Sequence, residues 1–347
     1  MAPTSASNGG ATVTTAAKNI LNRRKQKVVV IMGPTGSGKS KLSIDLSTIF
    51  LKSTEIINSD KMQVYKGLDH TTNKIPLIER KGVPHHLLGE FQPTESTPEF
   101  TPLTFRTRGG DIISQIINRR KIPFIVGGSN SFIYSLLAKR FDPDFDVFDE
   151  SNSVDFLCKD LRYDCCFIWV DVDLHVLNEY LDIRVDEMLE SGMLEELGEF
   201  FESELSKVDK HFGILKAIGV PELENYFRHY YNNKNNNSSG RGADVAEYDR
   251  AVRLIKLNTR VLAKRQLGKI QRLREAGWDL HKIDATQAFR KAIELKRKMK
   301  NKEGVVVVVE GGGGVVALDG GESTTSCVWE KQVLEPSVKI VKQFLME

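Results

Sequence analysis

Short apolar runs alternate with longer amphipathic segments through residues 28–210. Runs rich in β-branched or aromatic residues predict buried strands at 28–32, 55–58, 123–126 and 165–170. Apolar residues that recur at helical spacing predict helices over 39–51, 108–119, 131–138 and 174–205. Because strands and helices alternate, we expect an α/β fold in which helices flank a parallel sheet.

The C-terminal third follows a different pattern. Residues 211–302 form a basic, mostly helical part that we expect to bind substrate, and residues 303–347 combine a Gly/Val-rich insert with a C-terminal helix. The Asn-rich stretch 229–243 and the low-complexity stretch 303–326 are expected to be surface insertions, the first of them a polar loop. Four basic residues share one stripe of the predicted helix, beside an apolar stripe: Arg253, Lys256, Arg260 and Lys264.

Composition places the chain among soluble globular proteins. It has 347 residues, of which 40% are hydrophobic and 27% charged, enough for two domains or one large domain with an appendage. Apolar runs of about 18 residues are absent, so we expect no membrane-spanning helix. The four cysteines include no CxxC pair, which argues against a disulfide scaffold and a zinc finger and favours a reducing compartment.

Charge is distributed unevenly behind a net charge of +3. Residues 250–302 contain 17 Lys and Arg against 4 Asp and Glu, an excess of 13 positive charges. A basic segment on an acidic body suggests an anionic ligand or a nucleic acid, and the alternative is a solvated helix face. Residues 1–27 are rich in Ala, Ser, Thr and Asn and contain no acidic residue, which is typical of an organellar, here plastid, transit segment or of a disordered tail.

The strongest single motif is GPTGSGKS, which matches GxxxxGK[ST] and stands between a predicted strand and a predicted helix. Glycines allow successive amides to point inward, the helix N-terminus favours anions, Lys39 adds a full charge and the Ser40 hydroxyl can reach Mg²⁺. We therefore expect a P-loop that binds a di- or triphosphate, within an NTPase-like sheet. Its residues are Gly33, Pro34, Thr35, Gly36, Ser37, Gly38, Lys39 and Ser40.

Two further polar residues follow predicted strands. Asp60 comes directly after the second strand, and Ser129 follows the glycines that end the third. Ligands bind outside the carboxyl ends of parallel strands, so both residues should lie near the P-loop. Asp60 is a candidate general base, metal ligand or helix cap, and Ser129 is a candidate substrate contact or N-cap. The adjacent His85 and His86 lack ligand-spaced partners, which argues against a metal site there.

Several motifs in fixed order resemble those of the isopentenyltransferases. After GPTGSGKS come INSDKMQVYKGLDHTTNK, VPHHLLG, FIVGGSNSFI, RVDEMLESGMLEEL, LKAIGVPEL and TRVLAKRQ. The resemblance covers residues 28–300, with 28–210 as the P-loop catalytic core. It is strongest to the plant adenylate isopentenyltransferases of cytokinin biosynthesis, in a family that also includes the tRNA isopentenyltransferases.

The resemblance implies a reaction and roles for individual residues. A dimethylallyl group would pass from dimethylallyl diphosphate to the exocyclic amine of AMP, ADP or ATP, with Mg²⁺ and Lys39 at the donor diphosphate. Asp60 would accept the amine proton, and Ser129 would orient the amine. Substrate phosphates would meet residues of later motifs, namely Arg184, Lys216, Arg260 and Lys264.

The same resemblance bears on the acceptor. Members that act on tRNA carry a helical insertion before the fourth strand, where this chain has only residues 139–164, and eukaryotic ones tend to end in a zinc finger, which this sequence lacks. A free nucleotide is therefore expected, and tRNA is the alternative suggested by the basic segment. A small-molecule kinase would share the P-loop but has no need of the SDKMQVYKGLD block.

Overall fold

The computed structural model describes residues 25–50, 53–94, 96–97, 99–204, 213–236, 241–300, 309–310, 314–315 and 324–347. Its main sheet is six-stranded and parallel throughout, in the order β3-β2-β4-β1-β5-β6. This order places β4 between β1 and β2, so the loops that follow these three strands emerge side by side. The strands are β1 (Lys27–Met32), β2 (Thr54–Asn58), β3 (His85–His86), β4 (Ile122–Gly127), β5 (Asp164–Asp171) and β6 (Leu280–Asp284).

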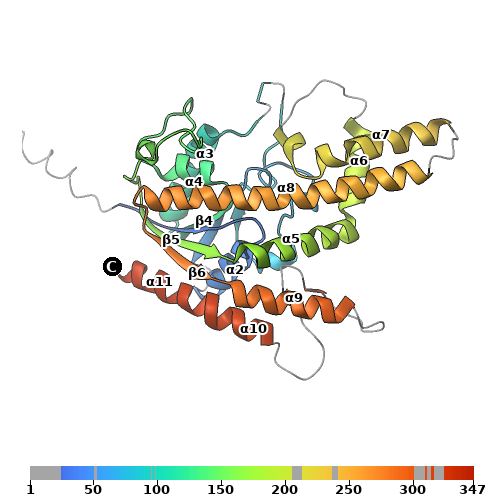
Figure 1. Cartoon of the computed structure of the whole chain (residues 1–347). Coiled ribbons are helices and arrows are strands. Elements are labelled where there is room, and N and C mark those ends of the chain that lie inside the picture. The colour runs from blue at the N-terminus through green and yellow to red at the C-terminus, as the bar shows by residue number, and fades with distance from the viewer. Residues whose placement is uncertain are drawn as a thin grey trace, which may run out of the picture.

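Helices cover both faces of the sheet (Figure 1), which confirms the expected α/β class. The long helices are α2 (Lys39–Ile49), α3 (Pro102–Asn118), α4 (Asn130–Leu137), α5 (Leu174–Met188), α6 (Leu194–Glu204), α7 (Val220–Asn236), α8 (Arg241–Glu275), α9 (Thr286–Lys300), α10 (Thr324–Trp329) and α11 (Glu335–Met346). Short helical turns are η1 (Leu77–Arg80), η2 (Val154–Phe156), η3 (Leu189–Met193), η4 (Gly213–Lys216) and η5 (Glu330–Leu334). The predicted single helix over 174–205 is broken at Gly192, whose φ of 111° is not helical.

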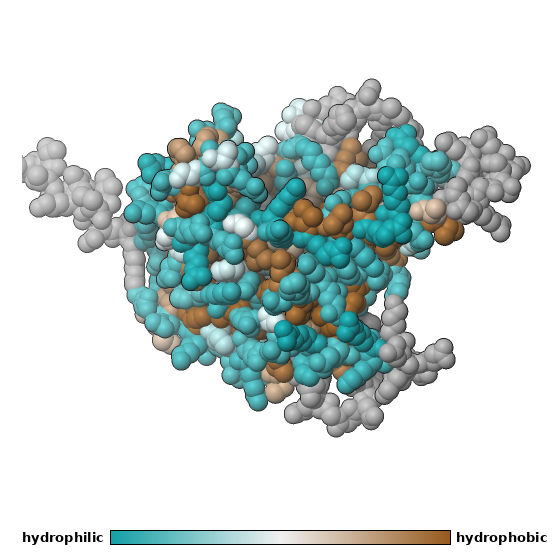
Figure 2. Space-filling model, viewed as in Figure 1, coloured by the Kyte–Doolittle hydropathy of each residue, from teal (hydrophilic) through white to brown (hydrophobic). Residues whose placement is uncertain are grey.

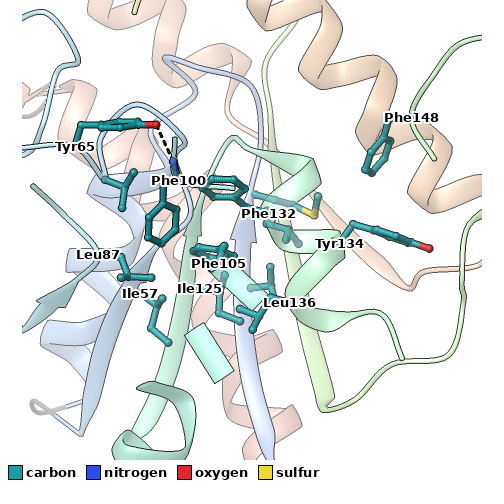
Figure 3. Packing of buried hydrophobic residues seen from close by; sticks show 14 of the residues in the cluster. Ile57, Tyr65, Leu87, Phe100, Phe105, Ile125, Phe132, Tyr134, Leu136 and Phe148 are labelled. Atoms are coloured by element: carbon teal, nitrogen blue, oxygen red, sulfur yellow. Dashed lines mark hydrogen bonds between the residues drawn. The ribbon is translucent and has the colours of Figure 1, made fainter. Parts of the chain in front are cut away.

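Alternate strand residues feed two separate cores, because successive side chains of a strand point to opposite faces. Val28 and Val30 of β1 join the core beneath α3 and α4, whereas Val29 and Ile31 join the core beneath α2 and α9. Figure 3 shows the first core, where aromatic rings from α3 and α4 stack above the strands and the Phe100 N–H donates to the Tyr65 hydroxyl at 2.9 Å. The two cores fix β1, β4 and β2 in place and so fix the loops at their carboxyl ends.

Four strands were not predicted from the sequence. Two of them, β7 (Val309–Glu310) and β8 (Gly314–Val315), pair as a separate antiparallel sheet, and the other two belong to the main sheet. β3 consists of only two residues, and β6 lies inside a segment expected to be largely helical. Gly277, with φ of 95°, follows the end of α8 and allows the chain to turn back beside β5, where Leu280 registers with Phe167. β6 has one buried residue, Ile283, so its sequence carries a weak strand pattern.

The Asn-rich stretch 229–243 is not simply a loop. α7 runs to Asn236 and α8 begins at Arg241, so the expected polar loop is wrong for residues 229–236 and 241–243, whereas 237–240 lie outside the described residues. Tyrosines extend α7 into this stretch, because the Tyr231 hydroxyl donates to the Gly198 carbonyl at 2.8 Å and the Tyr230 ring stacks on Tyr226. Most of residues 303–326 and all of 1–24 also lie outside the described residues.

Four residues of the basic segment form ion pairs with α5, a helix that lies between α8 and α9 (Figure 1). Both basic helices form ion pairs with its carboxylates: Lys256–Asp186 at 2.6 Å, Arg260–Asp182 at 2.9 Å, Lys296–Glu187 at 2.5 Å and Arg297–Glu179 at 2.6 Å. Part of the positive charge of this segment is therefore used in ion pairs that hold α8 and α9 against α5.

The face crossed by α8 is mostly hydrophilic with scattered apolar patches (Figure 2). Leu254 and Leu257 are among the exposed apolar residues of α8.

In the described part of the chain, no helix is both long enough and apolar enough to cross a membrane.

Candidate active site

The glycine-rich motif forms a loop between β1 and α2, as predicted. Gly36 and Gly38 adopt φ of 76° and 87°, in the left-handed region that favours glycine. A Cβ at Gly36 would lie 2.5 Å from Cδ2 of Leu181, so a side chain there would also collide with α5. The first turn of α2 contains no acidic residue, which leaves its N-terminus suited to an anion.

Lys39 folds back over this loop. Its ammonium donates to the Pro34 carbonyl at 2.7 Å. Burial lowers the pKa of Lys39 to about 8, with Asp60 opposing the shift and Arg184 adding to it. The two named charges therefore lie close enough to Lys39 to form one electrostatic cluster with it.

Arg184 reaches the P-loop from α5. Its Nη1 would lie 3.4 Å from a Cβ at Gly36. Burial lowers the pKa of Arg184, and Tyr180 and Asp60 oppose that shift. The guanidinium therefore places a second positive charge beside the glycines, where it can meet a diphosphate.

Asp60 stands at the carboxyl end of β2 and shapes the turn that follows. Its Oδ1 accepts from the N–H of Met62 at 2.9 Å and of Gln63 at 3.3 Å. In the described structure, Oδ2 takes part in no hydrogen bond. Asp60 thus caps a turn with one oxygen and leaves the other for chemistry.

The chain beyond Asp60 is held by contacts of the Glu196 carboxylate and the Lys74 ammonium. Glu196 of α6 accepts from the N–H groups of His70 at 3.0 Å and Thr71 at 2.8 Å. Lys74 pairs with Asp69 at 2.9 Å and donates to the Gly67 carbonyl at 2.6 Å. The INSDKMQVYKGLDHTTNK block therefore forms a loop that is held both by its own side chains and by α6.

Ser129 lies between the P-loop strand and the Asp60 strand, at the end of β4. It occupies the N-cap position of α4, but its side chain makes no capping hydrogen bond. Its N–H donates to the Ser59 carbonyl at 3.2 Å, which ties it to the residue before Asp60. The hydroxyl is therefore available to a ligand, which favours the substrate-contact interpretation over the capping one.

The other residues predicted to bind substrate phosphates, which are Lys216, Arg260 and Lys264, are less closely grouped. Lys216 pairs with Glu99, which also lies 3.8 Å from Lys61, the neighbour of Asp60. Arg260 pairs with Asp182 of α5. Lys264 is exposed, and in the described part of the chain it forms no ion pair. Of the three, Lys264 is the most available to a phosphate in solution.

Two residues that border the P-loop were missed by the sequence reasoning. Gln266 of α8 accepts from the Thr35 N–H through Oε1 at 2.6 Å. Trp329 of α10 lies on the outer side, where its ring atom Cη2 would be 2.7 Å from a Cβ at Gly38, and its indole N–H donates to Asp45 at 2.9 Å. Gln266 lies at helical spacing from the buried residues Ala263 and Ile270, so the sequence could have indicated that it is buried. Nothing near Trp329 in the sequence points to the P-loop.

The histidine pair has a structural explanation. His86 contacts Glu55 at 2.7 Å, and His85 contacts the Val83 carbonyl at 2.8 Å. Burial tends to raise the pKa of Glu55, but Arg119, His86 and Lys121 together lower it to about 2. No cluster of three or more potential metal-binding side chains occurs in the described ranges.

Comparison with known proteins extends over nearly the whole chain. The family described as IPP transferase matches residues 63–155 and 144–272. The chain is 49% identical over 324 residues to adenylate isopentenyltransferase 1, chloroplastic, of Arabidopsis thaliana, covering 93% of this chain and 82% of that protein. It is 49% identical over 327 residues to the adenylate isopentenyltransferase of Humulus lupulus, covering 91% and 90%.

Solved structures show the same fold. A eukaryotic dimethylallyltransferase acting on tRNA superposes with a TM-score of 0.60 at 26% identity, covering 79% of this chain and 77% of that chain. The tRNA delta(2)-isopentenylpyrophosphate transferase of Staphylococcus epidermidis gives a TM-score of 0.58 at 24% identity, covering 80% and 100%.

Proposed function

Since this chain belongs to the IPP transferase family, we propose that it is an adenylate isopentenyltransferase, a prenyltransferase of cytokinin biosynthesis. It transfers the dimethylallyl group of dimethylallyl diphosphate to the exocyclic amine of adenine in AMP, ADP or ATP. The identity of 49% across 93% of the chain to a plant adenylate isopentenyltransferase carries this conclusion. A phosphate-binding loop next to a strand-end carboxylate is the geometry that such a transfer requires.

On the donor side, the leaving group is a diphosphate. The bond between the allylic carbon and the diphosphate oxygen breaks, and the electron pair leaves with the oxygen. The amides of the P-loop, Lys39 and Arg184 can stabilise this growing negative charge, which is larger in the transition state than in the bound donor. Burial of Lys39 strengthens its interaction with that charge.

On the acceptor side, the adenine amine forms a bond to the allylic carbon and must lose a proton. Asp60 is proposed to accept it through Oδ2, while Oδ1 stays in the turn. Ser129, tied to Ser59 through its backbone, is proposed to orient the amine. Arg260, Lys264 and Lys216 are proposed to meet the acceptor phosphates.

Members of this family use a divalent cation with their diphosphate substrates, and we propose Mg²⁺ for this chain. The exposed Ser40 hydroxyl at the start of α2 makes no hydrogen bond within the described residues, and it offers an oxygen donor of the kind that Mg²⁺ prefers. When bound, Mg²⁺ would supply charge neutralisation of the diphosphate.

A free nucleotide fits the structure better than tRNA as the acceptor. Between α4 and β5 the chain forms only η2 and an isolated bridge, with no helical domain. Basic residues of α8 and α9 that could grip an RNA backbone are partly paired with α5. Organellar targeting agrees with the chloroplastic relatives and with adenylate isopentenyltransferase 7, mitochondrial, at 41% identity, and we propose the plastid.

The test is incubation of the purified protein with Mg²⁺, labelled dimethylallyl diphosphate and either AMP, ADP and ATP or bulk tRNA. Label in a nucleotide supports the proposal. Label in tRNA alone keeps the chemistry and replaces the acceptor. Absence of label, with ATP consumed in the presence of a small acceptor, would replace the proposal with a kinase.

A further inference from the structure

Gln266 touches both loops of the site from a third element, α8. Its Oε1 accepts from the Thr35 N–H of the P-loop at 2.6 Å. Its Nε2 lies 2.5 Å from the position that a Cβ would take at Gly128, next to Ser129. Its backbone carbonyl accepts from the Asn130 side chain at 3.1 Å. One residue therefore connects the donor loop to the loop proposed to orient the acceptor.

This contact is buried and sterically close. Gln266 is 8% exposed, and Asn130 is 3% exposed. A buried amide is held in one orientation by its hydrogen bonds, since leaving it unpaired is costly. Gly128 has no side chain to displace the amide, so the end of β4 approaches α8 closely.

We propose that Gln266 is a positioning residue that sets the spacing between the P-loop and the Gly128–Ser129 loop. Each substrate binds chiefly to one loop, so the loss of Gln266 disturbs the alignment of donor and acceptor more than the binding of either. This inference rests on the proposed function, because it takes the two loops as the donor and acceptor sides of one reaction. A displacement of about 1 Å between reacting groups can reduce a rate by about 100-fold.

The test compares Gln266→Met, which keeps the length but loses both polar atoms, with Gln266→Asn, which keeps the amide but is one methylene shorter. The matched control is Gln271→Met, on the same helix but exposed. Calorimetric titration with Mg²⁺ and inorganic diphosphate measures the fraction of protein whose P-loop is intact and binds diphosphate. The value of kcat is then expressed per intact loop. We expect both Gln266 variants to lose about 10- to 100-fold in kcat, with KM for either substrate changed less than about threefold.

Other outcomes overturn the proposal. Gln266 variants that match Gln271→Met in kcat per intact loop would show that the contact is only structural. Variants in which KM rises while kcat is preserved would make Gln266 a binding residue. If the wild-type protein transfers no prenyl group but binds diphosphate normally, the proposed function fails. The positioning role would still fail separately if Gln266→Met then left the protection of the P-loop and of the Gly128–Ser129 loop against proteolysis unchanged.

Discussion

The ammonium of Lys39 and the carbonyl of Pro34 lie 2.7 Å apart within the same P-loop. One of the N–H donors of Lys39 is therefore used by the loop itself. The ammonium has two further N–H donors for a diphosphate, provided that Lys39 is protonated.

The pH dependence of donor capture follows from Lys39. Its pKa near 8 means that the ammonium is present below this pH and lost above it. We expect kcat/KM for dimethylallyl diphosphate, which reports the free enzyme, to fall as pH rises through about 8. Bound diphosphate raises the pKa of Lys39, so kcat should stay flatter over the same range. Lys39→Arg keeps its charge and should lack this limb. An unchanged limb in Lys39→Arg would assign it to another group.

Asp60→Asn tests the proposed base with little disturbance of the loop. Asparagine keeps an Oδ1 that can accept from the N–H groups of Met62 and Gln63. We expect transfer to fall by about 100- to 10,000-fold, with diphosphate affinity nearly intact. Asp60 raises the pKa of Lys39, so the variant's donor-binding limb should move to lower pH. Near-normal transfer by Asp60→Asn would remove Asp60 from proton transfer.

Lys264 and Arg260 differ in their ion pairing, because Arg260 is paired with Asp182 and Lys264 forms no ion pair in the described part of the chain. Lys264→Ala should raise KM for ATP about tenfold, and less for AMP, because a charge-assisted contact is worth about 1.5–3 kcal/mol. Donor KM should not change. Arg260→Ala leaves Asp182 without its partner, so it should also lower thermal stability. Equal effects of Lys264→Ala on ATP and AMP would place Lys264 away from the terminal phosphates.

Trp329 is expected to support the P-loop from outside. Trp329→Ala removes a buried ring and should reduce the free energy of unfolding by about 3–5 kcal/mol. It should also raise donor KM, because Gly38 and α2 lose their neighbour. Trp329→Phe keeps a ring but loses the hydrogen bond to Asp45 and should cost about 1 kcal/mol. Urea denaturation and donor kinetics measure both effects, with the exposed Cys327→Ser as a control. Destabilisation with an unchanged donor KM would limit Trp329 to a folding role.

Sequence patterns predicted the features that depend on residues close together in the chain. The P-loop was identifiable because its glycines, Lys39 and its flanking strand and helix are contiguous in sequence. Asp60 and Ser129 followed from the rule that strand ends share an edge. Strand β6 and the role of Gln266 were not predicted, because each depends on a neighbour more than 100 residues away. The basic stripe was visible, but its pairing with α5 required the packing of three helices.

The contact between Trp329 and Asp45 joins residues 284 positions apart. During synthesis, the P-loop and α2 leave the ribosome well before α10, the helix that covers their outer side. A chain that has been made only up to α9 therefore carries the complete phosphate-binding motif without the helix that packs against it. Full donor affinity would then be reached only once α10 has been made and has packed against α2.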